Sequence, residues 1–213
     1  MYKTGGVNAI RNIEGIGDFY KTSNIADDSA EALSKLKSGL DNLTTNPNPI
    51  FQIFDFDKTK FLEAASEFIS TKGVGSTTSG PLYDFSRGNG VGPYVELVGT
   101  KGLKDKGHNV LEFDNKTFIA SDNIEFDIDS ITQFSSKIFA NQAKASLVDP
   151  ERATIFATRM SDWISVSPSE RVGQFIVPEA NPLLFSREAY DAIKAVNPDI
   201  RIVDIKGNIL PRP

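Results

Sequence analysis

The stretch that decides the fold runs from Gly92 to Ala145 and reads GPYVELVGTKGLKDKGHNVLEFDNKTFIASDNIEFDIDSITQFSSKIFANQAKA. Its first part, 92–106, carries apolar residues at helical spacing, and Gly107 follows where a helix would end. These apolar residues are Val95, Val98 and Leu103. We therefore predict a helix here, with Glu96 at the rim of its buried stripe.

A meander of strands is expected after this helix. HNVLEF is typical of a short strand, and a second apolar run follows between two turn clusters, Asp114-Asn115 and residues 121–123. In NIEFDIDSI, the apolar residues alternate strictly with Glu125, Asp127 and Asp129, so the three carboxylates share one face of a strand. The next strand, KIFANQAKAS, places Gln142 and Lys144 on one face.

The rest of the chain completes an α/β fold. DPERATIFATRMSDWI predicts a helix whose inner side carries Ile155, Phe156, Met160 and Trp163. A strand ended by Pro178, a helix capped by Ser186 and the final strand IRIVDI follow. We expect a central mixed β-sheet flanked by helices, with a small N-terminal helical region.

Two domains are expected, because KGVGSTTSGPL has the Gly, Ser and Thr content of a linker. The first is a helical region at 1–75, which mediates delivery or interaction or packs on the rest. The second is the α/β domain at 88–213, which carries the acidic strand.

Composition excludes several classes of protein and of site. With 39% hydrophobic and 24% charged residues, the chain is expected to be soluble and globular, and no apolar run is long enough to span a membrane. The absence of cysteine excludes disulfides and thiolate sites, and the single histidine, His108, excludes a site built on paired histidines. We expect His108 to cap the helix end or contact solvent.

The acidic strand and the strand after it point to metal-assisted phosphodiester hydrolysis. A hard cation such as Mg²⁺ prefers oxygen ligands, which Asp127, the Gln142 carbonyl and Glu96 could supply. Asp129 shares the face of Asp127, so either could be the principal ligand. Lys144 would orient water or offset charge in the transition state. Mn²⁺ and Zn²⁺ are alternative metals.

The order Glu96, Asp127 and Gln142-Ala143-Lys144 resembles the core of the restriction-endonuclease-like, or PD-(D/E)XK, superfamily, whose Mrr-like branch often has Gln before the lysine. Within it, GVGPYVE, LKDKGHNV and IEFDID are similar to the C-terminal nuclease domains of bacterial contact-dependent inhibition and Rhs polymorphic toxins. The resemblance covers roughly 88–177, and Gln142 departs from it by replacing the usual acid.

The resemblance implies an enzyme, a nuclease and hydrolase that cleaves DNA or tRNA with a divalent metal. It implies a toxin domain that is delivered to the cytoplasm of a target bacterium as part of a longer secreted protein, and a cognate immunity protein. The net charge of −5 is unusual for a protein that binds nucleic acid. We therefore look to Lys101, Lys104, Arg152 and Arg159 for contacts to phosphate.

Two alternatives stay open. The chain could be a non-catalytic binding or structural protein of phage or secretion-system origin, in which the acidic strand is a solvated face. It could also be a phosphohydrolase, because Asp55-Phe56-Asp57-Lys58-Thr59 resembles the first motif of the haloacid dehalogenases. Asp57 is equally suited to cap a helix with an apolar stripe of Phe61, Ala64, Ala65 and Phe68.

Overall fold

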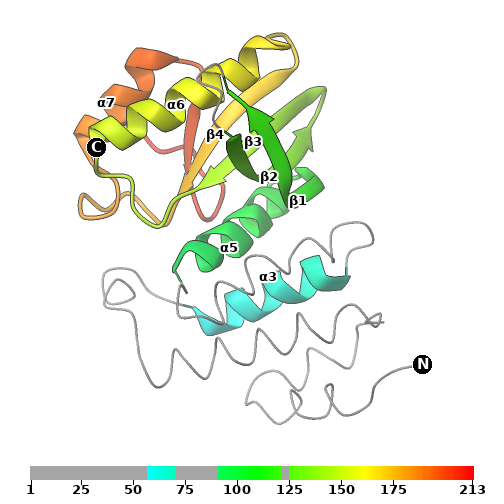
Figure 1. Cartoon of the computed structure of the whole chain (residues 1–213). Coiled ribbons are helices and arrows are strands. Elements are labelled where there is room, and N and C mark those ends of the chain that lie inside the picture. The colour runs from blue at the N-terminus through cyan, green and yellow to red at the C-terminus, as the bar shows by residue number, and fades with distance from the viewer. Residues whose placement is uncertain (1–56, 71–90, 121–124) are drawn as a thin grey trace. The chain divides into compact units, whose positions relative to one another are not determined.

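A computed structural model describes residues 57–70, 91–120 and 125–213, and confirms the α/β class (Figure 1). In chain order the elements are α3 (Lys58–Ser70), α5 (Val91–Asp105), β1 (Asn109–Ile119), β2 (Glu125–Phe134), β3 (Lys137–Ala143), α6 (Pro150–Ser165), β4 (Arg171–Val177), α7 (Arg187–Val196) and β5 (Arg201–Asp204). The expected linker and the expected turn at 121–123 lie outside the described residues.

The chain divides into two compact units, residues 1–98 and 99–213, and the division falls inside α5. In the first unit, Asp57 caps α3, because the Lys60 N–H donates to Asp57 Oδ1 at 3.0 Å. The predicted stripe of α3 is fully buried, and its Phe61 ring stacks on Tyr94 with 6.0 Å between centroids. Capping therefore accounts for Asp57, while Asp55 lies outside the described residues.

The second unit is built on a five-stranded sheet in the order β1-β2-β3-β4-β5. The strands β1, β2 and β3 are antiparallel, whereas β3, β4 and β5 are parallel. The change of direction follows from the connections: a short turn joins β2 to β3, and the helices α6 and α7 form the crossovers to β4 and β5. The strand β3 is thus the one that joins the antiparallel and parallel halves.

The predicted break at Asp114-Asn115 is wrong, because β1 is one strand of 11 residues. Its pairing with β2 runs from Phe113 opposite Ser130 to Lys116 opposite Ile128, so three steps along β1 match two along β2. Such an irregularity absorbs an extra residue without ending the strand. The polar pair therefore shifts the register of β1, which the local sequence pattern cannot distinguish from a turn.

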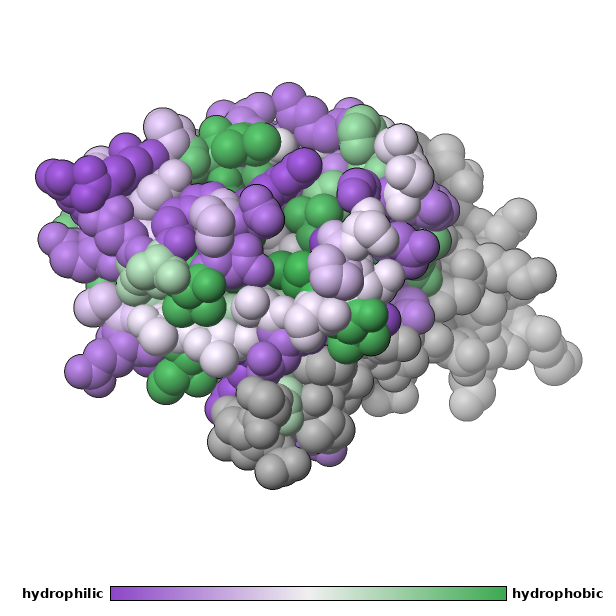
Figure 2. All heavy atoms as spheres, turned by 90° about the horizontal axis from the view of Figure 1, so that it is seen from above, coloured by the Kyte–Doolittle hydropathy of each residue, from purple (hydrophilic) through white to green (hydrophobic). Residues whose placement is uncertain are grey.

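Helices cover both faces of the sheet. Gly173 of β4 lies under Met160 and Ile164 of α6, and α6 and α7 lie together on this side (Figure 1). The outer surface of this layer is largely hydrophilic, with separate apolar residues among its described part (Figure 2). On the other face, the part of α5 that belongs to the second unit packs closely, with Gly99 against Ile176.

The inner side of α6 differs in part from the prediction. Met160 and Trp163 are buried as expected, but Ile155 is 48% exposed and Phe156 is only half-buried. The buried stripe consists of Ala153, Ala157, Met160, Trp163 and Ile164. Small alanines face the sheet because the helix lies close to it, so residue size misled the assignment of Ile155. The predicted cap Ser186 is confirmed, since it accepts a backbone N–H at the start of α7, and Asp149, which was not predicted as a cap, does the same for α6.

Close packing of α5 predicts that Gly102→Ala strongly destabilises the protein. A Cβ at position 102 would lie 2.1 Å from the backbone oxygen of Ile205, so the helix or the turn after β5 would have to move. We expect a loss of about 3 kcal/mol in the free energy of unfolding, measured by urea titration.

The matched control is Gly92→Ala in the same helix, where Glu96 Oε1 at 3.9 Å is the nearest atom to a new Cβ among the described residues. That change should alter stability by less than about 1 kcal/mol, because alanine favours a helix and meets no close neighbour. Equal effects of the two substitutions would contradict the close approach of α5.

Candidate functional site

A carboxylate and an amide meet where β2 and β3 lie side by side. The register pairs Ser130 with Asn141, which places the preceding residue of β2, Asp129, beside Gln142 of β3. Asp129 Oδ2 accepts hydrogen bonds from Gln142 Nε2 at 2.8 Å and from the Ala143 N–H at 2.5 Å. Strand pairing thus brings together two of the residues that the sequence analysis singled out.

Gln142 is buried with one polar atom unsatisfied. Its side chain is 4% exposed, and Oε1 has no hydrogen-bond partner among the described residues. The amide nitrogen donates to Asp129, so the oxygen is the atom left for another partner. Buried carbonyl oxygens without a partner are rare in folded proteins, and a water or an ion is a usual explanation. Gln142 Oε1 is therefore the atom of this site at which a bound water or ion is expected.

The surroundings of Asp129 stabilise its charged carboxylate poorly, because the group is buried. Burial raises its pKa to about 6, and the nearby Asp127 carboxylate adds to the rise. The charge of Lys144 and the hydrogen bonds from Ala143 and Gln142 act in the opposite direction without cancelling the effect of burial. A cation beside Asp129 would favour its charged form.

Lys144 follows the last residue of β3, and its backbone N–H donates to Ile176 O at 2.8 Å, which extends the pairing with β4. Its ammonium lies 4.6 Å from the centre of the Phe156 ring. The guanidinium of Arg152 lies 5.8 Å from the same ring. The first turns of α6 therefore bring a second cation into the neighbourhood of Lys144.

The other predicted ligands are placed differently. Asp127 is exposed on β2 and influences Asp129 through its charge, so Asp129 is the carboxylate that contacts Gln142. Glu96 lies on the part of α5 that belongs to the first unit, whereas Asp129, Gln142 and Lys144 belong to the second. Within the described ranges, no three or more acidic or histidine side chains form a cluster that could hold a metal ion.

The four predicted contacts to phosphate come from two helices. Lys101 and Lys104 lie on α5, where the Lys101 ammonium forms an ion pair with Asp105 at 2.8 Å. Arg152 and Arg159 lie on α6. These helices cover opposite faces of the sheet, so the structure does not bring the two lysines together with the two arginines.

A buried polar network was not predicted. Asn141 Nδ2 donates to Ser130 O and to Thr132 Oγ1, each at 3.1 Å, and Asn141 Oδ1 accepts from Gln174 Nε2 at 3.0 Å. Ser130 Oγ also lies 3.0 Å from Thr100 Oγ1 of α5. The available signal was alternation, since Asn141 and Gln142 must face opposite sides and one of these polar residues had to enter the interior.

His108 contributes both to the helix end and to this network. Its backbone N–H donates to Leu103 O at 3.1 Å, as expected of a residue that caps the helix, and its half-buried ring makes contacts that were not predicted. Its Nδ1 lies 3.0 Å from Thr132 Oγ1, and its ring stacks on Phe134 with 5.0 Å between centroids. Burial, and then the charge of Arg201, lowers the pKa of His108. Gly107 precedes it at the helix end and has a φ of 94°, which suits glycine.

Comparison of the chain with protein families, with curated proteins and with solved structures finds no match. The helices in the described part of the chain include none with the length and apolar character of a membrane span.

The raised pKa predicts how stability depends on pH. Burial favours protonated Asp129, so the folded state holds this proton more tightly than the unfolded chain. The contribution of Asp129 to stability is therefore highest below about pH 4, falls as pH rises to about 6 and stays low above it. Asp129→Asn keeps an oxygen for both hydrogen bonds but carries no charge.

In metal-free buffer, we expect Asp129→Asn to exceed the unaltered protein in free energy of unfolding by about 1–2 kcal/mol near pH 7.5, and to match it near pH 4. Urea titrations across this range measure the difference. Glu125→Gln, an exposed change on the same strand, is the control. If the difference in free energy of unfolding between Asp129→Asn and the unaltered protein does not vary with pH, burial does not raise the pKa of Asp129.

Proposed function

We propose that this chain is a metal-dependent nuclease whose site is built from Asp129, Gln142 and Lys144. The observation that carries the proposal is the unpaired, buried Gln142 Oε1 beside a carboxylate of raised pKa. Both groups would be stabilised by a cation, and neither is stabilised fully by the described protein atoms.

The residues present suit a hard divalent cation. Mg²⁺ is commonly bound through one or two carboxylates together with waters and substrate phosphate. Asp129 and the Gln142 carbonyl would hold the metal directly, and Asp127 on the same face would act directly or through water. When bound, such a cation polarises phosphate and lowers the pKa of coordinated water.

Lys144 and Arg152 suit the substrate side of the site. The Lys144 ammonium is close enough to influence Asp129, so it can also offset the negative charge that grows on phosphate in the transition state. Arg152 shares the Phe156 ring with Lys144 and would contact a neighbouring phosphate of the chain being cut. The Ala143 N–H and the Gln142 amide fix Asp129, so the carboxylate does not need to reorient.

The biological role that we propose follows from the sequence resemblance. A nuclease domain of this kind would act as a toxin on the DNA or tRNA of a target bacterium after delivery within a longer secreted protein. A cognate immunity protein would then neutralise it. Expression in bacteria should be toxic, and Lys144→Ala should relieve the toxicity.

Incubation with plasmid DNA and with total tRNA tests the activity directly. We expect one of these substrates to be cleaved with Mg²⁺ or Mn²⁺, and to stay intact with EDTA. Asp129→Ala and Lys144→Ala should each lower the cleavage rate by about a hundredfold or more, because each removes a charged group from the reacting centre.

Lys206→Ala is the control for the lysine variant, because Lys206 is an exposed lysine beyond β5. It should cleave at the unaltered rate, and thermal unfolding should show that all variants are folded. Intact nucleic acid under every condition, or cleavage that survives Lys144→Ala, would contradict the proposal. The carboxylate face would then be assigned to a binding protein.

Arg152 is expected to contribute to substrate binding. In the cleavage assay, Arg152→Gln should raise KM and reduce the slope of log KM against log salt by about one, because one contact to phosphate is lost. Arg187→Gln, an exposed arginine at the start of α7, should change neither quantity. A fall in kcat at constant KM would place Arg152 in another role.

A further inference from the structure

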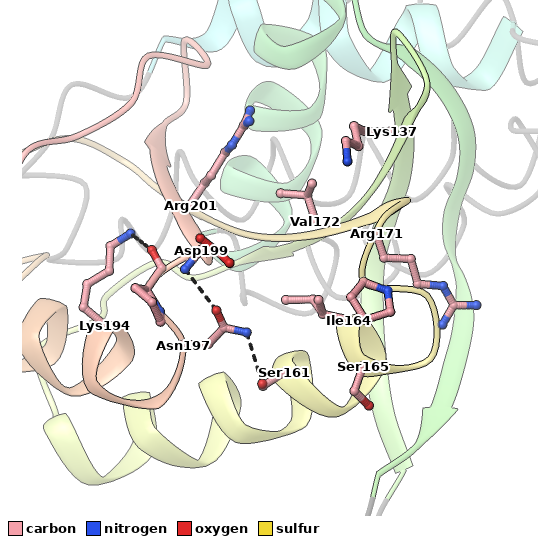
Figure 3. A pocket seen from close by; sticks show the side chains of 12 residues that line it. Lys137, Ser161, Ile164, Ser165, Arg171, Val172, Lys194, Asn197, Asp199 and Arg201 are labelled. Carbon is pink, nitrogen blue, oxygen red and sulfur yellow. Dashed lines mark hydrogen bonds between the residues drawn. The ribbon is translucent and has the colours of Figure 1, made fainter.

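A cleft of about 600 Å³ opens at the end of the sheet away from Asp129. Lys137, Arg171 and Arg201 are the first residues of the parallel strands β3, β4 and β5, and all three line it. Its remaining wall comes from the last turns of α6 and α7 and the residues just after them (Figure 3). Because Lys144 follows the other end of β3, this cleft is distinct from the site proposed above.

The cleft carries a concentrated positive charge. Four cations line it, Lys137, Arg171, Lys194 and Arg201, against a single carboxylate, Asp199. Among the described residues, none of these four cations forms an ion pair, in contrast to Lys60, Lys101 and Arg212. A chain with a net charge of −5 thus gathers four cations without ion pairs around one hollow.

Neutral groups hold these cations in place. Arg171 Nη1 donates to Trp163 O at 3.0 Å, and its guanidinium lies 4.7 Å from the centre of the Trp163 ring. Lys194 donates to the carbonyls of Pro198 and Ile200 at 2.8 and 2.7 Å. Carbonyls and aromatic faces orient a cation without cancelling its charge.

The other two cations are held in the same way. Arg201 lies 5.1 Å from the centre of the Phe139 ring, and Lys137 donates to Ser169 O. A guanidinium has five donors and an ammonium has three, so donors remain for a ligand. The cations of the cleft are therefore held in position, and Asp199 offsets only part of their charge.

We infer that this cleft binds a small phosphorylated molecule of nucleotide size. Its volume lies within the range of sites for small ligands, and arginine and lysine are the side chains that recognise phosphate. The lone carboxylate, Asp199, also lines the cleft, where the Asn197 amide is hydrogen-bonded to Ser161 and to the Asp199 N–H (Figure 3). A carboxylate suits a ligand that also carries hydrogen-bond donors, such as the hydroxyl and amino groups of a nucleotide. The inference does not depend on nuclease activity.

Calorimetric titration of the full chain with ATP in EDTA tests this inference, with inorganic phosphate and a short oligothymidylate as separate arms. Trp163 is the only tryptophan of the chain and lies under Arg171, so its fluorescence provides a second readout. We expect ATP to bind with a stoichiometry of one, to change Trp163 fluorescence and to bind more weakly as salt increases. Inorganic phosphate should compete with ATP at higher concentration.

Arg201→Gln and Lys137→Gln should each weaken ATP binding by about tenfold, because each removes a charged donor. Arg187→Gln removes an equal charge outside the cleft and should leave the affinity unchanged. Thermal unfolding checks that each variant is folded. Absence of ATP binding, or binding unaffected by both cleft variants, would overturn the inference. Binding of oligothymidylate but not ATP, sensitive to the same variants, would also overturn it and assign the cleft to a polynucleotide.

Discussion

The second unit depends on the hydrogen bonds that the side-chain amide of Asn141 makes. This amide donates to Ser130 and Thr132 of β2 and accepts from Gln174 of β4, so one buried side chain joins three strands. An unmade hydrogen bond in this environment would be costly, and the arrangement therefore favours one register. That register sets Gln142 beside Asp129.

The two faces of β3 differ in how fully their buried polar groups are hydrogen-bonded. On the face of Asn141, donors and acceptors are paired in a continuous network that includes His108. On the face of Gln142, a carbonyl oxygen has no partner among the described residues and a neighbouring carboxylate has a raised pKa. A protein that satisfies one network and leaves the other incomplete loses stability at the second. Such departures concentrate at functional sites, which is the physical basis for placing the function here.

Local patterns in the sequence were sufficient to predict most of the helices and strands. The helix that ends just before Gly107 and the cap Ser186 were predictable because spacing and capping act over a few residues. The continuity of β1 and the inner face of α6 were not, because they depend on the neighbouring strand and on how close the helix lies to the sheet.

The site could be predicted only in part for the same reason. Alternation placed Asp127 and Asp129 on one face, but the choice between them required the register of β2 on β3. The cleft at the other end of β3 was not predictable at all. Three of its cations lie far apart in the sequence and meet because three parallel strands begin at the same edge, and the fourth, Lys194, comes from the last turn of α7.

The central claim is that Asp129 and Gln142 hold a divalent cation. Anomalous diffraction from crystals of the full chain soaked in Mn²⁺ tests it most directly, with Asp129→Asn crystals as the comparison. We expect an anomalous peak within coordination distance of Asp129 and Gln142 Oε1 that is absent in Asp129→Asn. A site without such a peak, in which Gln142 Oε1 is hydrogen-bonded to water alone, would contradict it.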